Sequence, residues 1–217
     1  FLNTSAFNAS SQWYWASAGK TLTATLVEIA QQEGFLNINN KTSDYLGNGW
    51  TTLSPQKENL ITVKNQLTMT TGLDYKVPNL DCTNPSCLEY KSDAGTQWYY
   101  HNAPYTLLEE VVSTATGIDY NIYTNQKIES IIGMNGQWRS LGFNNVYWSS
   151  PRDMARFGLL ILNKGNWNGI QVLSDENYYT QMTNSSQDLN PSYGYLWWLN
   201  GQSSTQFPGL PVALPIE

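Results

Sequence analysis

The sequence predicts an α/β domain that is mostly helical and whose β-sheet is incomplete. Several segments carry helical signals, whereas only one short segment near the end, 193–201, has the composition of a strand. A strand without neighbours leaves its backbone N–H and C=O groups unpaired, so partner strands are required. We therefore expect residues 1–217 to be an internal portion of one larger domain, with strands missing before Phe1 and after Glu217. The alternative is a small helical protein that ends in a hairpin.

The first predicted helix covers Ser17–Glu33. Apolar residues recur at helical spacing from Leu22 to Ala30, and Gly34 supplies a stop signal. Its apolar face predicts a buried amphipathic helix.

Proline and glycine delimit the other predicted helices. A short one is expected to end near Gly72, and the next is opened by Pro104 and closed by Gly117. Two more are expected over 119–133 and 150–165. After the aromatic strand candidate, the remaining residues are interrupted by proline and are expected to form a connection.

Composition excludes several classes of partner. The 217 residues, 41% of them hydrophobic, are enough to bury a sizeable core. A net charge of -6, a pI near 4.7 and the absence of a Lys/Arg run argue against nucleic acid. No apolar run approaches the roughly 18 residues of a membrane span, and the first ten residues lack the basic start of a signal peptide. The sequence carries no signal for an oligomeric state.

The two cysteines, Cys82 and Cys87, enclose a short turn that contains Pro85. We expect a local disulfide, which would indicate a periplasmic or secreted protein. Two free thiols are the alternative. We expect no metal site, because two cysteines and one histidine cannot complete a four-ligand zinc site without carboxylates.

Ser17 and Lys20 lie three residues apart at the start of the first predicted helix, so their side chains share one face. A lysine can activate a serine hydroxyl only if its amine is neutral near pH 7. The positive end of the helix and burial among the aromatic residues 13–15 are both expected to lower its pKa. The alternative is that Ser17 caps the helix and Lys20 lies in solvent.

A second candidate cluster is Tyr100-His101-Asn102, in a predicted loop just before a helix. A tyrosine at this place can relay protons, and an asparagine amide can bind polar atoms. The alternative for Tyr100 is a core aromatic role, since the chain has fourteen tyrosines.

Together, S-x-x-K at 17–20 and Y-x-N at 100–102 resemble motifs of the serine β-lactamase and penicillin-binding-protein superfamily. The branch with these motifs includes class C β-lactamases, D-alanyl-D-alanine carboxypeptidases and related esterases. Five further segments resemble parts of this superfamily. Residues 19–46 resemble its nucleophile helix and the turn after it, 61–73 its LL-x-x-x-SGL segment, and 102–117 its helix after Y-x-N. Residues 150–165 and 193–201 resemble its later helix and its strand entry. The resemblance implies the two-lobed β-lactamase/transpeptidase-like fold with the active site between the lobes, the helical lobe being nearly complete here.

The resemblance also implies residue roles. Ser17 would be the acylated nucleophile, with its backbone N–H forming half of the oxyanion hole, and Lys20 would be its base. Tyr100 would pass a proton to the leaving group, and Asn102 would contact the substrate amide and Lys20. The reaction would be acyl transfer and then hydrolysis of a small-molecule or peptide amide, ester or lactam, without a cofactor. The superfamily's third motif, Lys/His-x-Gly on a later strand, is not found. We therefore expect catalysis to require the longer protein of which residues 1–217 would be a part, here called the parent protein.

The sequence suggests three other interpretations. A Ser-His-Asp triad with His101 is rejected, because no G-x-S-x-G sequence occurs. A penicillin-binding sensor or pseudoenzyme would keep the fold without turnover. A carbohydrate-binding module would use the nine tryptophans, above all Trp197 and Trp198, as stacking platforms. Consecutive strand residues face opposite sides of a sheet, so core packing is favoured for this pair.

Overall fold

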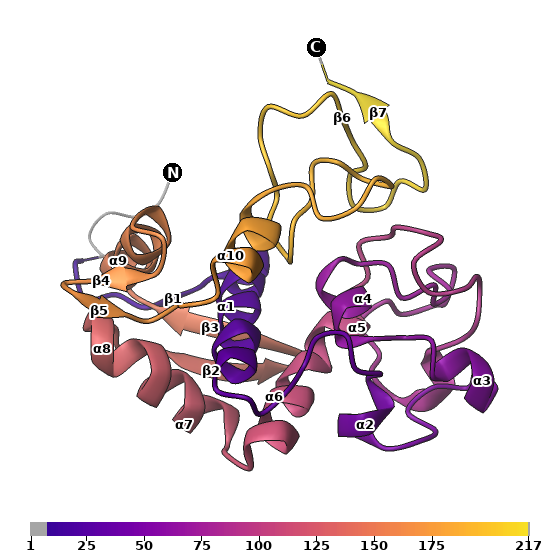
Figure 1. Cartoon of the computed structure of the whole chain (residues 1–217), viewed down its shortest axis with the longest axis horizontal. Coiled ribbons are helices and arrows are strands. Elements are labelled where there is room, and N and C mark those ends of the chain that lie inside the picture. The colour runs from indigo at the N-terminus through magenta and orange to yellow at the C-terminus, as the bar shows by residue number, and fades with distance from the viewer. Residues whose placement is uncertain (1–7, 217) are drawn as a thin grey trace.

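Helix α1, Gly19–Gln32, lies at the centre of the structure, a computed structural model that describes residues 8–216 (Figure 1). Leu22, Leu26 and Val27 on this helix are fully buried in one continuous hydrophobic core. Later helices pack around α1 because their own apolar faces need cover. Helix α1 is thus the element around which the rest of the structure is assembled.

Nine further α-helices follow within the described residues, most of them short. In chain order they are α2 (Ser43–Leu46), α3 (Pro55–Glu58), α4 (Val63–Leu67), α5 (Asn102–Thr106), α6 (Leu108–Thr116), α7 (Tyr120–Thr124), α8 (Ser130–Ile132), α9 (Pro151–Leu162) and α10 (Glu176–Thr183). Three tighter or wider turns accompany them: the 3₁₀ turns η1 (Ala16–Ala18) and η2 (Pro85–Cys87), and the π-helical turn η3 (Asn125–Glu129).

Short antiparallel sheets complete the described part of the chain. The strands are β1 (Trp13–Tyr14), β2 (Gln137–Leu141), β3 (Asn144–Ser149), β4 (Asn166–Trp167), β5 (Ile170–Gln171), β6 (Ser204–Thr205) and β7 (Leu214–Pro215). The first three form one sheet in the order β1-β3-β2, and β4-β5 and β6-β7 form separate pairs. The β6-β7 pair lies at the end of the chain, away from the three-stranded sheet (Figure 1).

The three-stranded sheet was not predicted from the sequence. Its β2-β3 hairpin pairs Trp138 with Tyr147 on the buried side, and the turn between the strands begins at Gly142, whose φ is +63°. Glycine adopts this conformation without steric cost. Strand β1 then adds to β3 through Trp13↔Ser149, which carries the chain to the start of α1.

The predicted strand at 193–201 is wrong. This segment is a tight turn with a single isolated bridge, Tyr193↔Trp198, and Leu196 reverses the chain with a φ of +59°. A Cβ atom at Gly194 would lie 2.0 Å from the carbonyl oxygen of Met182, so the close approach of two backbones requires glycine there.

The predicted helices all occur, with changed boundaries. The first begins at Gly19 rather than Ser17. The short helix that was expected to end near Gly72 is α4, which ends at Leu67 because Met69 adopts a φ of +59°. The helix opened by Pro104 is divided into α5 and α6, and the segment 119–133 is widened by η3. Helix α9 matches its prediction closely, since it starts at Pro151 behind a reciprocal Ser150 cap.

None of the helices within 8–216 combines the length and apolar content that a membrane crossing needs.

Candidate active site

Ser17 lies in the 3₁₀ turn η1 between strand β1 and helix α1, with its side chain exposed. Trp15 anchors this turn: its backbone N–H donates to the carbonyl of Tyr147 at 2.8 Å, and its Nε1 donates to Ser149 Oγ at 2.8 Å. Ala16 has a φ of +48°, a conformation that costs energy in a residue with a Cβ. The sheet therefore holds a strained turn that places the hydroxyl of Ser17 outside the core.

Lys20 is buried, with only 5% of its surface exposed, and its Nζ donates a hydrogen bond to Ser17 Oγ at 3.4 Å. The alternative of a capping serine and a solvent-exposed lysine does not fit this arrangement, because neither η1 nor α1 has a side-chain cap. The structure thus brings together the two residues of S-x-x-K.

Aromatic rings surround the Lys20 amine, although not the ones expected. Its Nζ lies 4.3 Å from the ring centroid of Tyr105 and 5.0 Å from that of Tyr100. Trp13 and Tyr14, which were expected to bury it, are about half exposed on strand β1. Burial lowers the pKa of Lys20 to about 8, against the opposing attraction of the Asp81 carboxylate.

Tyr100 adjoins both members of this pair. Burial raises its pKa, and a hydrogen bond with the Ser17 side chain acts in the opposite direction. Its hydroxyl is therefore protonated at neutral pH and lies beside the serine. The ring stacks on that of Trp198, with centroids 5.7 Å apart, so the tight turn 193–201 forms the next wall of the site.

Asn102 is the first residue of α5, and its Nδ2 donates to Asp81 Oδ1 at 2.7 Å. Its Oδ1 is buried and has no hydrogen-bond partner within the described residues. The amide group of Asn102 thus bonds to Asp81, and no hydrogen bond joins its Oδ1 to Lys20 within the described residues. Sequence reasoning missed Asp81, whose only sequence signal is its position directly before Cys82.

His101 is 3% exposed, and neither ring nitrogen has a hydrogen-bond partner within residues 8–216. Burial lowers its pKa to about 4, although Asp81 and Asp74 favour the charged form. The imidazole is neutral at physiological pH. The rejection of a Ser-His-Asp triad agrees with this geometry.

Cys82 and Cys87 form a disulfide across the turn η2, with their Cα atoms 5.9 Å apart. The bond lies directly after Asp81 in the chain. Within the described part of the chain, no three His, Cys, Asp or Glu side chains cluster closely enough to hold a metal ion.

The two tryptophans of the suggested sugar platform separate. The ring of Trp197 packs against Phe157, with centroids 6.4 Å apart, and Trp198 lies against Tyr100 and Tyr193. They form no common face for a sugar ring. Both instead support residues next to the site.

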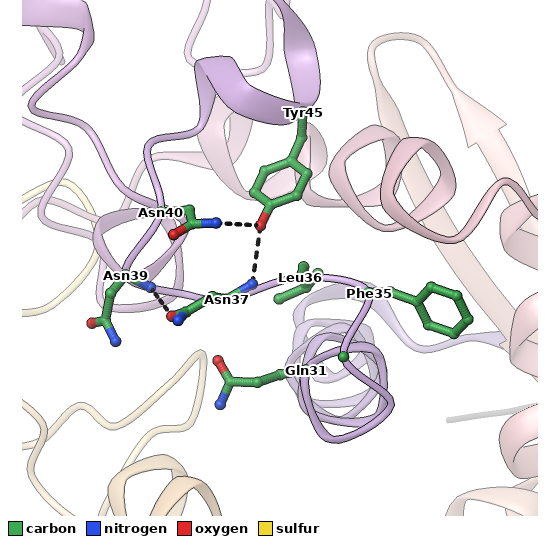
Figure 2. Close-up of a pocket in the computed structure, with 8 residues that line it drawn as sticks. Gln31, Phe35, Leu36, Asn37, Asn39, Asn40 and Tyr45 are labelled. Atoms are coloured by element: carbon green, nitrogen blue, oxygen red, sulfur yellow. Dashed lines mark hydrogen bonds between the residues drawn. The ribbon is translucent and has the colours of Figure 1, made fainter.

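A pocket of about 510 Å³ lies beyond the other end of α1 (Figure 2). Its lining is uncharged, and the Tyr45 hydroxyl accepts hydrogen bonds from the Asn37 backbone N–H and from Asn40 Nδ2. None of the side chains that line this pocket is charged, so the pocket offers no base that could activate a hydroxyl. A buried amine next to a serine hydroxyl is instead found at Lys20 and Ser17, which form the candidate active site.

Comparison with known proteins defines the family of this chain and the class of its fold. The family model described as Beta-lactamase matches residues 2–213, and the chain therefore belongs to the beta-lactamase family. A comparison with curated protein sequences finds no match.

Solved structures share the fold. A protein from Bacteroides dorei DSM 17855 assigned as a beta-lactamase has a TM-score of 0.71 and 17% identity over 89% of this chain and 67% of its own. One from Bacillus anthracis assigned as a 6-aminohexanoate-dimer hydrolase has a TM-score of 0.74 and 19% identity over 91% and 61%. A D-stereospecific amidohydrolase from Streptomyces sp. has a TM-score of 0.65 and 17% identity over 87% and 71%. The predicted β-lactamase-like fold is confirmed, and the chain spans 61% of the length of the second relative.

Proposed function

We propose that the protein is a serine hydrolase in which Ser17 forms an acyl-enzyme that water then hydrolyses. The observation that carries this proposal is the buried Lys20 amine, which has a lowered pKa and donates a hydrogen bond to Ser17 Oγ. Membership of the beta-lactamase family supports hydrolysis as the class of reaction.

In the proposed first step, neutral Lys20 takes the proton of the Ser17 hydroxyl as Oγ attacks the carbonyl carbon. The carbonyl oxygen becomes an oxyanion, and the backbone N–H of Ser17 is one of its donors. The Tyr100 hydroxyl gives its proton to the departing nitrogen or oxygen and recovers one from the Lys20 ammonium. Water then attacks the ester carbon while the Lys20 amine takes one of its protons, and this proton passes to Ser17 Oγ as the bond between Oγ and the acyl carbon breaks and the acid product leaves.

We infer that the substrate is a small amide, ester or lactam. A second oxyanion donor from the parent protein would complete the site. The disulfide beside the site supports an exported protein, since such bonds persist in oxidising compartments.

The test is covalent labelling of the full-length parent with a fluorophosphonate and with a fluorescent penicillin, followed by intact-mass analysis. We expect Ser17→Ala to abolish the mass increase from both probes. Ser54→Ala is the matched control, because Ser54 is exposed and makes no side-chain cap at α3. Undiminished labelling of Ser17→Ala would remove Ser17 from the mechanism. Labelling by the penicillin without release of its hydrolysed product would favour the penicillin-binding sensor instead.

A further inference from the structure

The turn that carries Asp81 is docked on the start of helix α5. The carbonyl of Leu80 accepts a hydrogen bond from the backbone N–H of Ala103 at 2.9 Å. Within the turn, Asn79 Oδ1 accepts from the Asp81 N–H at 2.9 Å, which fixes the backbone of Asp81. The disulfide that begins at Cys82 closes the next loop. Asp81 is therefore held against Asn102 from both sides.

The Asp81 carboxylate determines the orientation of the Asn102 amide. An ionised carboxylate only accepts hydrogen bonds, so the 2.7 Å contact requires the NH₂ end of the amide to face Asp81. The oxygen end then remains as a buried acceptor without a partner among the described residues. A buried acceptor of this kind is costly until a donor reaches it. Such a donor can come from a substrate N–H or from the protonated base.

Asp81 also contributes charge to the environment of the base. Within residues 8–216, the titratable groups that act on Lys20 are the rings of Tyr100 and Tyr105 and the carboxylate of Asp81. Burial raises the pKa of both tyrosines, so they are neutral at pH 7. The carboxylate is thus the charged group that opposes the desolvation of the Lys20 ammonium.

We propose that Asp81 is a positioning residue of the active site, which orients the Asn102 amide as a hydrogen-bond acceptor and balances the charge of the Lys20 base. This inference rests on the function proposed above. The role is distinct from catalysis, because Asp81 acts through Asn102 and Lys20 rather than on the reacting atoms.

Two variants of the full-length parent separate the two effects. Asp81→Asn removes the charge but keeps an oxygen that accepts from Asn102 Nδ2, whereas Asp81→Ala removes both. Loss of the charge lowers the pKa of Lys20. The pH range in which the acylation rate rises with pH therefore shifts to lower values in both variants. Asp188→Asn, at an exposed position, is the charge-matched control and leaves the pH profile unchanged.

The second readout compares the acylation rates of two probes. A fluorophosphonate has no amide N–H for Asn102, whereas a fluorescent penicillin has one on its side chain. We expect Asp81→Ala to reduce the second-order rate of penicillin acylation by roughly 10- to 100-fold, as for loss of a hydrogen bond to a charged group. The fluorophosphonate rate at its high-pH plateau stays within about twofold, and Asp81→Asn retains most of the penicillin rate. Thermal melts monitor folding of each variant.

The outcomes are distinguishable from those of the proposed function. If the parent is acylated at Ser17 and both Asp81 variants keep its pH profile and its penicillin rate, the role of Asp81 is overturned and the serine mechanism stands. If both probes lose rate equally at every pH, Asp81 is a purely structural residue and the proposal is again wrong. If the parent itself is not labelled at Ser17, the serine mechanism fails, and the role of Asp81 fails with it.

Discussion

Replacing Lys20 by arginine tests the central feature of the site, a lysine that is neutral often enough to act as a base. With a pKa of about 8, about one tenth of the Lys20 amines are neutral at pH 7, against about 0.03% at the ordinary lysine pKa of 10.5. Burial against Tyr100 and Tyr105 thus raises the amount of reactive base about 300-fold. A guanidinium remains protonated in proteins, so Lys20→Arg keeps the positive charge and removes the base.

We expect stopped-flow acylation of the full-length Lys20→Arg variant to be slower by roughly 10²–10⁴-fold, the range typical of losing a general base. In the parent, the acylation rate should rise with pH up to about 8 and then level off, because the neutral amine is the reactive form. The variant should lack this dependence. Thermal melts control for folding. A folded variant that is acylated at the parental rate, or a parent whose rate still rises steeply above pH 9, would refute the assignment of Lys20.

Three further results are expected. Non-reduced peptide mass spectrometry of exported protein should find Cys82 joined to Cys87, and two freely alkylated thiols would contradict the disulfide. Burial raises the pKa of Glu28 to about 8, so its contribution to stability is present at low pH and is lost as the pH rises through 8. Glu28→Gln should therefore raise the melting temperature at pH 9 but not at pH 4, and equal effects at both would exclude a protonated Glu28. Gly194→Ala should destabilise by about 1–3 kcal/mol in denaturant unfolding, because its Cβ meets an α10 carbonyl, whereas Gly158→Ala, with open space around it, should not.

Much of the helical framework could be predicted because its signals are local. Pro151, the Ser150 cap and the apolar spacing of α9 act within a few residues of one another. The three-stranded sheet was missed since the pairing of Trp138 with Tyr147 joins two irregular patterns in which most side chains stay exposed or half-buried. The strand predicted at 193–201 failed because an aromatic run satisfies a strand and a packed turn equally well.

In the candidate site, too, local features could be predicted from the sequence and contacts between distant segments could not. S-x-x-K and Y-x-N are visible in the sequence because each depends on spacing within one turn of chain. In the structure, Lys20 and Tyr100 both form hydrogen bonds with the Ser17 side chain. The rings that bury Lys20 were assigned to the wrong segment, because the sequence cannot show which aromatic residues a helix start will face. Asp81 was missed since its contact to Asn102 crosses 21 positions of the chain.

By itself, the sequence determined which residues are the candidates for catalysis, where the main helices lie, and the family to which the chain belongs. These features depend on residue type and on short-range spacing, and both are given by the amino-acid sequence itself. The tertiary structure alone decided the environment of the candidate site. Burial against Tyr105 lowers the pKa of Lys20, and Asp81 opposes that shift and orients Asn102. Desolvation and charge coupling depend on distances between segments remote in sequence, and only folding sets those distances.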